Sequence, residues 1–220
     1  LYEDKSCNLW IGTIAGIDKT NLKKKNIFYY KRTDNPAFFD LPDNIIASVY
    51  KDKSGKIWIG SWGKGLFILD RNSRHIIHYN AESSGLNHIP GNHVHVIFED
   101  SKSQIWIGTR NGVSVYNSAN GKFIPAHEYF QAPEYNCFNS IRVYCIMEDS
   151  NGQIWVGTGN GIRILDVMTK DVTIIKSEGE GPVKISSNLV YSVLEDNDHE
   201  IWIATSEGLD CYFPETNKVV

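Results

Sequence analysis

The loop Ser61-Trp62-Gly63-Lys64-Gly65 holds the residues best suited to contact a ligand. Trp62 is the only tryptophan that stands outside the position at which tryptophan otherwise recurs along the chain. An indole ring stacks well on the apolar face of a pyranose, and a nearby lysine can reach a hydroxyl or a carboxylate. Trp62 and Lys64 in one short loop therefore predict contact with a sugar.

Polar residues occupy the corresponding loops of other repeats. Arg110 and Asn111 follow one strand, Asn160 follows the equivalent strand of the next repeat, and Arg142 opens the strand between them. The long segment before Arg142 adds four aromatic residues, Tyr129, Phe130, Tyr135 and Phe138. The alternative is that these aromatics fill their own loop. The candidate ligand-binding residues are Trp62, Lys64, Arg110, Asn111, Tyr135, Arg142 and Asn160.

Two histidines offer a different chemistry. His93 and His95 lie two residues apart on an expected strand, so both face the same side. That spacing suits a metal ion with His88 or His127 as a further ligand, but solvated or structural histidines are the favoured interpretation. The chain holds no nucleophile elbow, zinc-protease motif or phosphate-binding loop. We expect no catalytic residue, no metal and no cofactor.

A tryptophan phrase that recurs five times defines the scaffold beneath these loops. Its tryptophans stand 48, 48, 49 and 47 residues apart, in the segments 8–13, 56–61, 104–109, 153–158 and 200–205. An acidic turn precedes each phrase, a glycine and an aliphatic residue follow it, and the flanking stretches alternate as strands do. A period of this length predicts one four-stranded unit per repeat, with each recurring tryptophan packed between units.

The sequence therefore predicts an all-β fold, a β-propeller of four-stranded antiparallel blades. The repeats lie at about 1–40, 41–88, 89–136, 137–184 and 185–220. We expect five blades of a seven-bladed ring within a longer chain, and a closed five-bladed ring, in which the fifth repeat packs on the first, is the alternative. Connections at about 34–44, 81–92, 127–140 and 177–188 vary most, and variable loops on a constant scaffold are the usual place for binding.

Composition limits the partners of the chain. The 220 residues carry a formal net charge of −4, which disfavours nucleic acid because phosphate recognition leaves a basic surplus. No apolar run is long enough to span a membrane. The cysteines at 7, 137, 145 and 211 occupy different repeat positions. Unpaired thiols are favoured over a Cys137–Cys145 disulfide.

The segment Glu148-Asp149-Ser150-Asn151-Gly152-Gln153-Ile154-Trp155-Val156-Gly157-Thr158, followed by Gly161-Ile162, resembles the two-component regulator propeller repeat. The resemblance extends over all five repeats. It implies the periplasmic sensor region of a hybrid two-component histidine kinase, a homodimer that binds an oligosaccharide and signals to the kinase. It also implies further blades and sensor domains in the same parent chain. The motif residues are scaffold, so the resemblance assigns no binding residue.

The turn before Trp58 also resembles the Asp-box of sialidase-like propellers. Those enzymes need three arginines that converge on a carboxylate, and of the six arginines only Arg110 and Arg142 are expected on the binding face. A sialidase-like glycosidase is therefore the least favoured function. We expect a non-enzymatic propeller that senses an oligosaccharide, with a non-binding scaffold or dimerisation propeller as the alternative.

Overall fold

The structure, a computed structural model, describes residues 2–4, 8–13, 16–21, 26–30, 45–70, 75–83, 88–130, 133–179 and 181–220, without the side chains of 21, 26–30 and 133–135. The chain forms five antiparallel sheets, each of four consecutive strands, which confirms the predicted all-β propeller. The first two blades are β1 (Tyr2–Glu3), β2 (Asn8–Thr13), β3 (Gly16–Asn21), β4 (Asn26–Tyr30) and β5 (Ile46–Lys51), β6 (Ile57–Ser61), β7 (Leu66–Asp70), β8 (His75–Tyr79).

The remaining blades repeat this order. The third blade is β9 (Val94–Glu99), β10 (Ile105–Thr109), β11 (Gly112–Asn117) and β12 (Lys122–Pro125). The fourth is β13 (Val143–Glu148), β14 (Gln153–Thr158), β15 (Gly161–Asp166) and β16 (Val172–Ile175). The fifth is β17 (Val190–Glu195), β18 (Ile201–Thr205), β19 (Gly208–Phe213) and β20 (Lys218–Val219). Two short helices, α1 (Ala126–Phe130) and the 3-10 helix η2 (Pro133–Phe138), join the third blade to the fourth.

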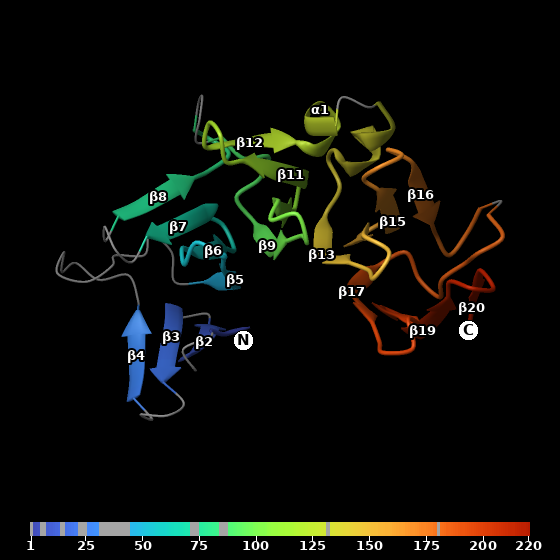
Figure 1. Ribbon diagram of the computed structural model, residues 1–220, viewed down its shortest axis with the longest axis horizontal. Helices are drawn as coiled ribbons and strands as arrows, with labels where there is room; N and C mark the ends of the chain where they lie inside the picture. Colours follow the sequence, from blue (N-terminus) through green and yellow to red (C-terminus); the bar gives the residue numbers. More distant parts are fainter. Residues whose placement is uncertain are drawn as a thin grey trace.

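The blades stand side by side in an open arc (Figure 1). The first strands of neighbouring blades, β5, β9, β13 and β17, pack against one another along the inside of the arc. The first and last blades lie apart at its open side, so the alternative of a closed five-bladed ring is not the arrangement in this structure. No helix in the described part of the chain is long and apolar enough to cross a membrane.

The two ends of the strands form two different faces. We call the end with the turns between first and second strands, at 52–56, 100–104, 149–153 and 196–200, the turn face. The opposite end, the loop face, carries the turns between second and third strands, at 62–65, 110–111, 159–160 and 206–207, and the connections between blades.

Each blade is closed on the turn face by an aspartate that binds its own tryptophan. In the fourth blade Asp149 accepts hydrogen bonds from the Trp155 indole Nε1 at 2.8 Å and from the Gln153 backbone N at 2.8 Å. The same pair of bonds recurs in all five blades, through Asp4–Trp10, Asp52–Trp58, Asp100–Trp106, Asp149–Trp155 and Asp196–Trp202. The acidic turn and the tryptophan of the repeat therefore act as one unit, which we call the Asp–Trp clasp.

The tryptophans also join neighbouring blades, as the sequence predicts. Trp58 of the second blade packs edge-on against Tyr116 and Phe123 of the third, at ring distances of 5.0 and 6.2 Å. In the first four blades a glycine two residues beyond the tryptophan permits this approach: a Cβ at Gly108 would lie 2.5 Å from Val143 Cγ1 in the next blade. Blade-to-blade packing thus explains why this short phrase recurs.

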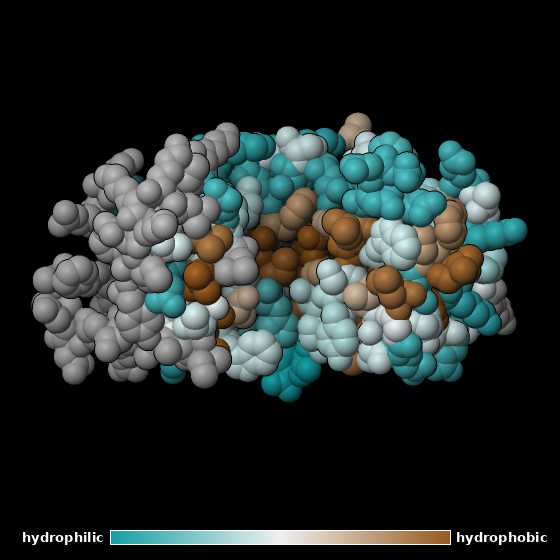
Figure 2. Space-filling model, turned by 90° about the horizontal axis from the view of Figure 1, so that it is seen from below, coloured by the Kyte–Doolittle hydropathy of each residue, from teal (hydrophilic) through white to brown (hydrophobic). Residues whose placement is uncertain are grey.

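The last blade differs because no described blade covers its far side. Leu194 and Leu209 are each 62% exposed. Figure 2 shows the molecule from the open side of the arc, with apolar surface on the inside of the arc and over the last blade.

Candidate functional site

A β-bulge lies near the loop face in the first strand of each of the last four blades. In the fourth blade Val143 pairs with Thr158 and Cys145 with Gly157, so Tyr144 is left out of the ladder. The equivalent residues left out in the other blades are Ala47, His95 and Tyr191. A bulge turns its extra side chain away from the regular pleat. The repeat thus presents one side chain per blade at the same height of the arc.

Four rings at this height form a continuous stack, which we call the aromatic ladder: Trp62, His95, Tyr144 and Tyr191. Trp62 lies parallel to His95 at 5.1 Å, and His95 lies nearly parallel to Tyr144 at 5.7 Å. Tyr191 meets Tyr144 edge-on at 5.5 Å. The inner rungs cover each other, while Trp62 and Tyr191 are 52% and 49% exposed.

Trp62 takes the place of a missing rung in the second blade. The bulged residue there is Ala47, which has no ring to offer. The backbone N of Trp62 donates to the Ile45 carbonyl at 2.9 Å and holds the loop over this strand. The extra tryptophan of the sequence therefore completes a row that the other blades build from their first strands.

His95 is held as a neutral side chain within the ladder. Its Nδ1 donates to the Val143 carbonyl at 2.9 Å. Burial lowers the pKa of His95 and outweighs the hydrogen bond to Val143, which raises it; the charges of Arg142 and Arg110 lower it further. The neutral ring then leaves Nε2 as a hydrogen-bond acceptor.

The histidine pair packs on Trp62. The ring of His93 meets Trp62 edge-on at 5.9 Å, next to the parallel stack with His95. Among the side chains that the structure describes, no three His, Cys, Asp or Glu residues gather as a metal site.

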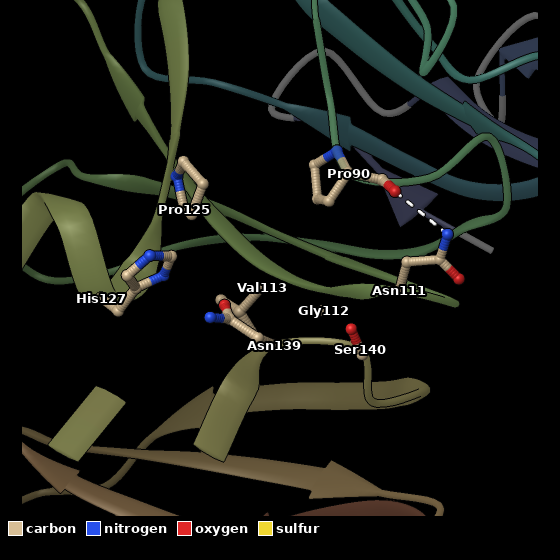
Figure 3. A pocket seen from close by; sticks show the side chains of 8 residues that line it. All are labelled: Pro90, Asn111, Gly112, Val113, Pro125, His127, Asn139 and Ser140. Atoms are coloured by element: carbon tan, nitrogen blue, oxygen red, sulfur yellow. Dashed lines mark hydrogen bonds between the residues drawn. The ribbon is translucent and has the colours of Figure 1, made fainter. Parts of the chain in front are cut away.

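Two hollows flank the segment that leads into β13. The first, of about 550 Å³, lies on the side of the third blade between Pro90, Pro125 and His127 (Figure 3). Asn111 lines it and donates from Nδ2 to the Pro90 carbonyl at 3.1 Å. The second, of about 660 Å³, opens on the side of the fourth blade. Asn139 and Ser140 line both hollows.

The second hollow adjoins the aromatic ladder. Tyr144 lines it as well as forming a rung, and Arg142 Nη1 donates to the Tyr144 hydroxyl at 3.2 Å. Asn160 and Arg163 line its far side. Within the described residues no Asp or Glu lines either hollow. The acid and base that a glycosidase would need are not found there.

The predicted site residues fall into three groups. Trp62, Arg110 and Arg142 lie around the ladder, since the Arg110 backbone N donates to the His93 carbonyl at 3.0 Å and Arg142 donates to the Tyr144 hydroxyl. Asn111 and Asn160 line one hollow each. Lys64 lies beside the rim of its own blade, where its carbonyl accepts a hydrogen bond from His78 Nε2 at 2.5 Å. The side chain of Tyr135 lies outside the described residues.

The other loop aromatics fill their own loop. Phe138 is fully buried, and Phe130 is buried in a parallel stack on Trp106 at 5.6 Å. The Tyr129 hydroxyl donates to Gln104 Oε1 at 2.8 Å. Phe130 and Phe138 are therefore packing residues of this loop, and Tyr129 is held by Gln104.

Two further expectations are settled by the geometry. Arg163 was not expected on the binding face, but it lines the second hollow together with Arg142, so that expectation was wrong. Its side chain reaches the loop face because Nη1 is drawn to the turn at 158–161. Cys137 and Cys145 are unpaired thiols, so the alternative disulfide does not form. Cys7, Arg32, Arg71 and Arg74 lie outside the described residues.

This geometry defines a β-propeller of four-stranded antiparallel blades. The model of the two-component regulator propeller repeat matches residues 40–63, 88–111, 137–160 and 184–207. The second to fifth repeats are therefore two-component regulator propeller repeats. No curated protein sequence matches the chain.

Solved structures share the fold. Two are of the extracellular domain of BT4673 from B. thetaiotaomicron, described as a proposed one-component system in one and a proposed hybrid two-component system in the other. They superpose with TM-scores of 0.74 and 0.73 at 22% and 21% identity, over 95% of this chain and 26% of theirs. A third, the extracellular domain of the proposed hybrid two-component system BT3049 from the same organism, gives 0.56 at 22% identity over 95% of this chain and 32% of its own. The chain thus spans about a quarter to a third of these domains.

Proposed function

We propose that this propeller is the ligand-recognition segment of an extracytoplasmic, periplasmic sensor, and that its ligand is an oligosaccharide bound along the aromatic ladder. The repeat family and the fold of the extracellular domains support the sensor role. The ladder supports the ligand class, because sugars bind through stacking of C–H groups on aromatic rings with polar groups around them.

The exposure of the ladder is the observation that carries this proposal. Trp62 is half exposed although its ring is stacked on His95 and meets His93 edge-on. A ring held upright in this way loses little conformational entropy when a sugar stacks on it. Arg142 and the neutral His95 add a donor and an acceptor beside the platform.

The rest of the sensor completes the proposal. The parent chain supplies further blades and sensor domains, a dimer contact, and a histidine kinase that receives the signal. Binding across Trp62 of the second blade and Tyr191 of the fifth would fix the angle between blades, and such a change in blade angle is a signal that a rigid neighbour can read.

The test is calorimetric titration of the complete protein with a panel of plant and host oligosaccharides. Saturable binding that Trp62→Ala weakens about tenfold or more supports the ladder as the site. Ile77→Ala is the matched control, since Ile77 is an exposed apolar residue on the rim strand β8. Binding that survives Trp62→Ala unchanged places the ligand elsewhere in the protein.

A second candidate is a scaffold or dimerisation propeller, and the exposed Leu194 and Leu209 of the last blade favour it. In that case Leu209→Glu disrupts assembly in sedimentation experiments, and Trp62→Ala does not change the affinity of the protein for any oligosaccharide. The same two variants therefore distinguish an oligosaccharide sensor from a scaffold.

A further inference from the structure

Arg163 is an arginine at a position where the scaffold needs none. It is the second residue after the glycine that opens the third strand of its blade, and the same position holds Asp18, Phe67, Ser114 and Asp210 in the other blades. A position that accepts an acid, a phenyl ring and a hydroxyl imposes no packing demand for a guanidinium. The arginine of the fourth blade thus calls for a local reason.

The guanidinium is buried and anchored at one corner. Arg163 is 4% exposed, and its Nη1 donates to Thr158 Oγ1 at 2.7 Å and to the Asn160 carbonyl at 2.6 Å. Among the described residues its Nε has no hydrogen-bond partner, although it is buried. A buried donor left unpaired costs about 1–3 kcal/mol, and more when the group is charged.

No negative charge compensates this cation in the described part of the chain. No described carboxylate lies within ion-pair distance of Arg163. The thiol of Cys137 lies beside it, but burial raises the pKa of Cys137 more than Arg163 lowers it, so the thiol stays neutral near neutral pH. A charge buried without a counter-charge is stable only when something else supplies one.

The hollow that Arg163 lines is equipped for an anion. Arg142 lines it as a second cation, and Asn136, Asn139, Asn160 and Ser140 bring amide and hydroxyl donors. Guanidinium groups bind carboxylate and sulfate oxygens through paired, charge-assisted hydrogen bonds. The net charge of the whole chain is −4, so this pair of cations is a local feature.

We infer that this hollow binds an anionic group, a carboxylate or a sulfate ester, of a ligand whose adjoining sugar lies on the aromatic ladder. Tyr144 connects the two parts, since it is a rung and also lines the hollow. This inference rests on the proposed function and narrows it to acidic oligosaccharides.

The test compares one sugar chain in charged and neutral forms. The complete protein is titrated with trigalacturonate, with its methyl ester, with neutral galactotriose and with galactotriose that carries a sulfate ester. Arg163→Ser is the informative variant, because Ser114 shows that the scaffold accepts serine at this position. Lys184→Met is the matched control, since it removes an exposed cation from the connection between the fourth and fifth blades, outside the hollow.

We expect at least one charged trimer to bind about tenfold or more tightly than its neutral form, and Arg163→Ser to remove that difference. Preference for trigalacturonate identifies a carboxylate, and preference for the sulfated trimer identifies a sulfate ester. Lys184→Met leaves the difference in place. Equal loss of charged and neutral ligands in Arg163→Ser would mean that Arg163 only supports the fold, and would overturn the inference.

Failure of the inference is distinguishable from failure of the proposed function. Neutral and charged trimers that bind alike, and that are lost together in Trp62→Ala, keep the ladder and remove the anion site. If no trimer binds, the anion site is tested by the melting temperature of the protein. It is measured with free galacturonate or inorganic sulfate and compared with sodium chloride of equal ionic strength. A rise in melting temperature that Arg163→Ser abolishes supports the anion site without the glycan. The absence of such a rise refutes the anion site.

Discussion

The turn face and the loop face are built from the same repeats, yet only one of them is regular. On the turn face the Asp–Trp clasp recurs in every blade. On the loop face the equivalent positions hold an alanine, a histidine and two tyrosines at the bulges, and hollows with different linings.

The turn face and the loop face also differ in how completely their polar groups are hydrogen-bonded. On the turn face Ser101 donates from its backbone N and its Oγ to the two oxygens of Glu148 in the next blade, at 2.6 and 2.7 Å. Ser150 and Glu195 repeat the arrangement one blade further on. On the loop face Arg163 Nε and His127 Nδ1 are buried and have no hydrogen-bond partner within the part of the chain that the structure describes. One face is optimised to join blades, and the other retains groups that a ligand can satisfy.

The two kinds of tryptophan give the sharpest test of this difference. Trp106→Ala removes a fully buried ring that stacks on Phe130 and binds Asp100, so we expect it to lower the free energy of unfolding by about 3–5 kcal/mol. Trp62→Ala removes a half-exposed ring and is expected to cost about 1 kcal/mol or less. Denaturant titration of both variants measures the contrast, and similar losses would contradict it.

Breaking one clasp while keeping its tryptophan has the next largest effect. Asp149→Ala leaves the buried indole N–H of Trp155 and the backbone N of Gln153 without their acceptor. We expect a loss of about 2–3 kcal/mol in the same titration. Asp171→Ala is the control, because this exposed aspartate of the same blade has no side-chain hydrogen bond in the described structure. A loss in Asp171→Ala as large as in Asp149→Ala would mean that net charge, and not the clasp, is responsible.

The sequence predicts the turn face far better than the loop face. The recurrent Trp, Gly and Asp report on packing that is the same in every blade, so repetition alone reveals them. The clasp itself was missed, although the constant six-residue separation from Asp52 to Trp58 and from Asp100 to Trp106 was its signal.

The ladder also had a signal in the sequence. Buried residues of the first strands stand three apart, as Val143 and Ile146 do, where a regular strand would place them two apart. This spacing indicates a bulge at Tyr144, whose side chain is then turned away from the regular pleat of the strand. That Trp62 fills the row above Ala47, and that Arg163 turns toward the hollow, depend on contacts between distant segments that no local pattern encodes.

The serine–glutamate contact between blades is worth less than a clasp. Glu148→Ala removes two charge-assisted hydrogen bonds from Ser101, but they lie at an exposed edge. We expect a loss of about 1 kcal/mol in denaturant titration. Ser101→Ala, which keeps the backbone N–H bond, is expected to cost less than Glu148→Ala. Equal costs would show that the hydroxyl bond alone matters.

The smallest effect is a pH dependence that belongs to the loop face. Burial and the nearby charges of Arg142, His93 and Arg110 lower the pKa of His95 below its usual value of 6.5. The unfolded chain then binds a proton at this position more readily than the folded one as pH falls below 6.5. The contribution of His95 to stability is therefore complete above 6.5 and decreases as pH falls through the folded pKa. His95→Tyr places in the third blade the rung that the fourth and fifth blades already use, and it removes this titration.

The measurement is the melting temperature of the wild type and of His95→Tyr between pH 8 and pH 5. We expect the two curves to run parallel above about pH 6.5 and to separate below it, with the wild type losing more stability. Glu195, whose lowered pKa comes from hydrogen bonds with Ser150 and His199 that outweigh its burial, loses its contribution only at more acidic pH in both proteins. Curves that stay parallel down to pH 5 would mean that His95 accepts a proton in the folded ladder, and the neutral acceptor assigned to its Nε2 would have to be withdrawn.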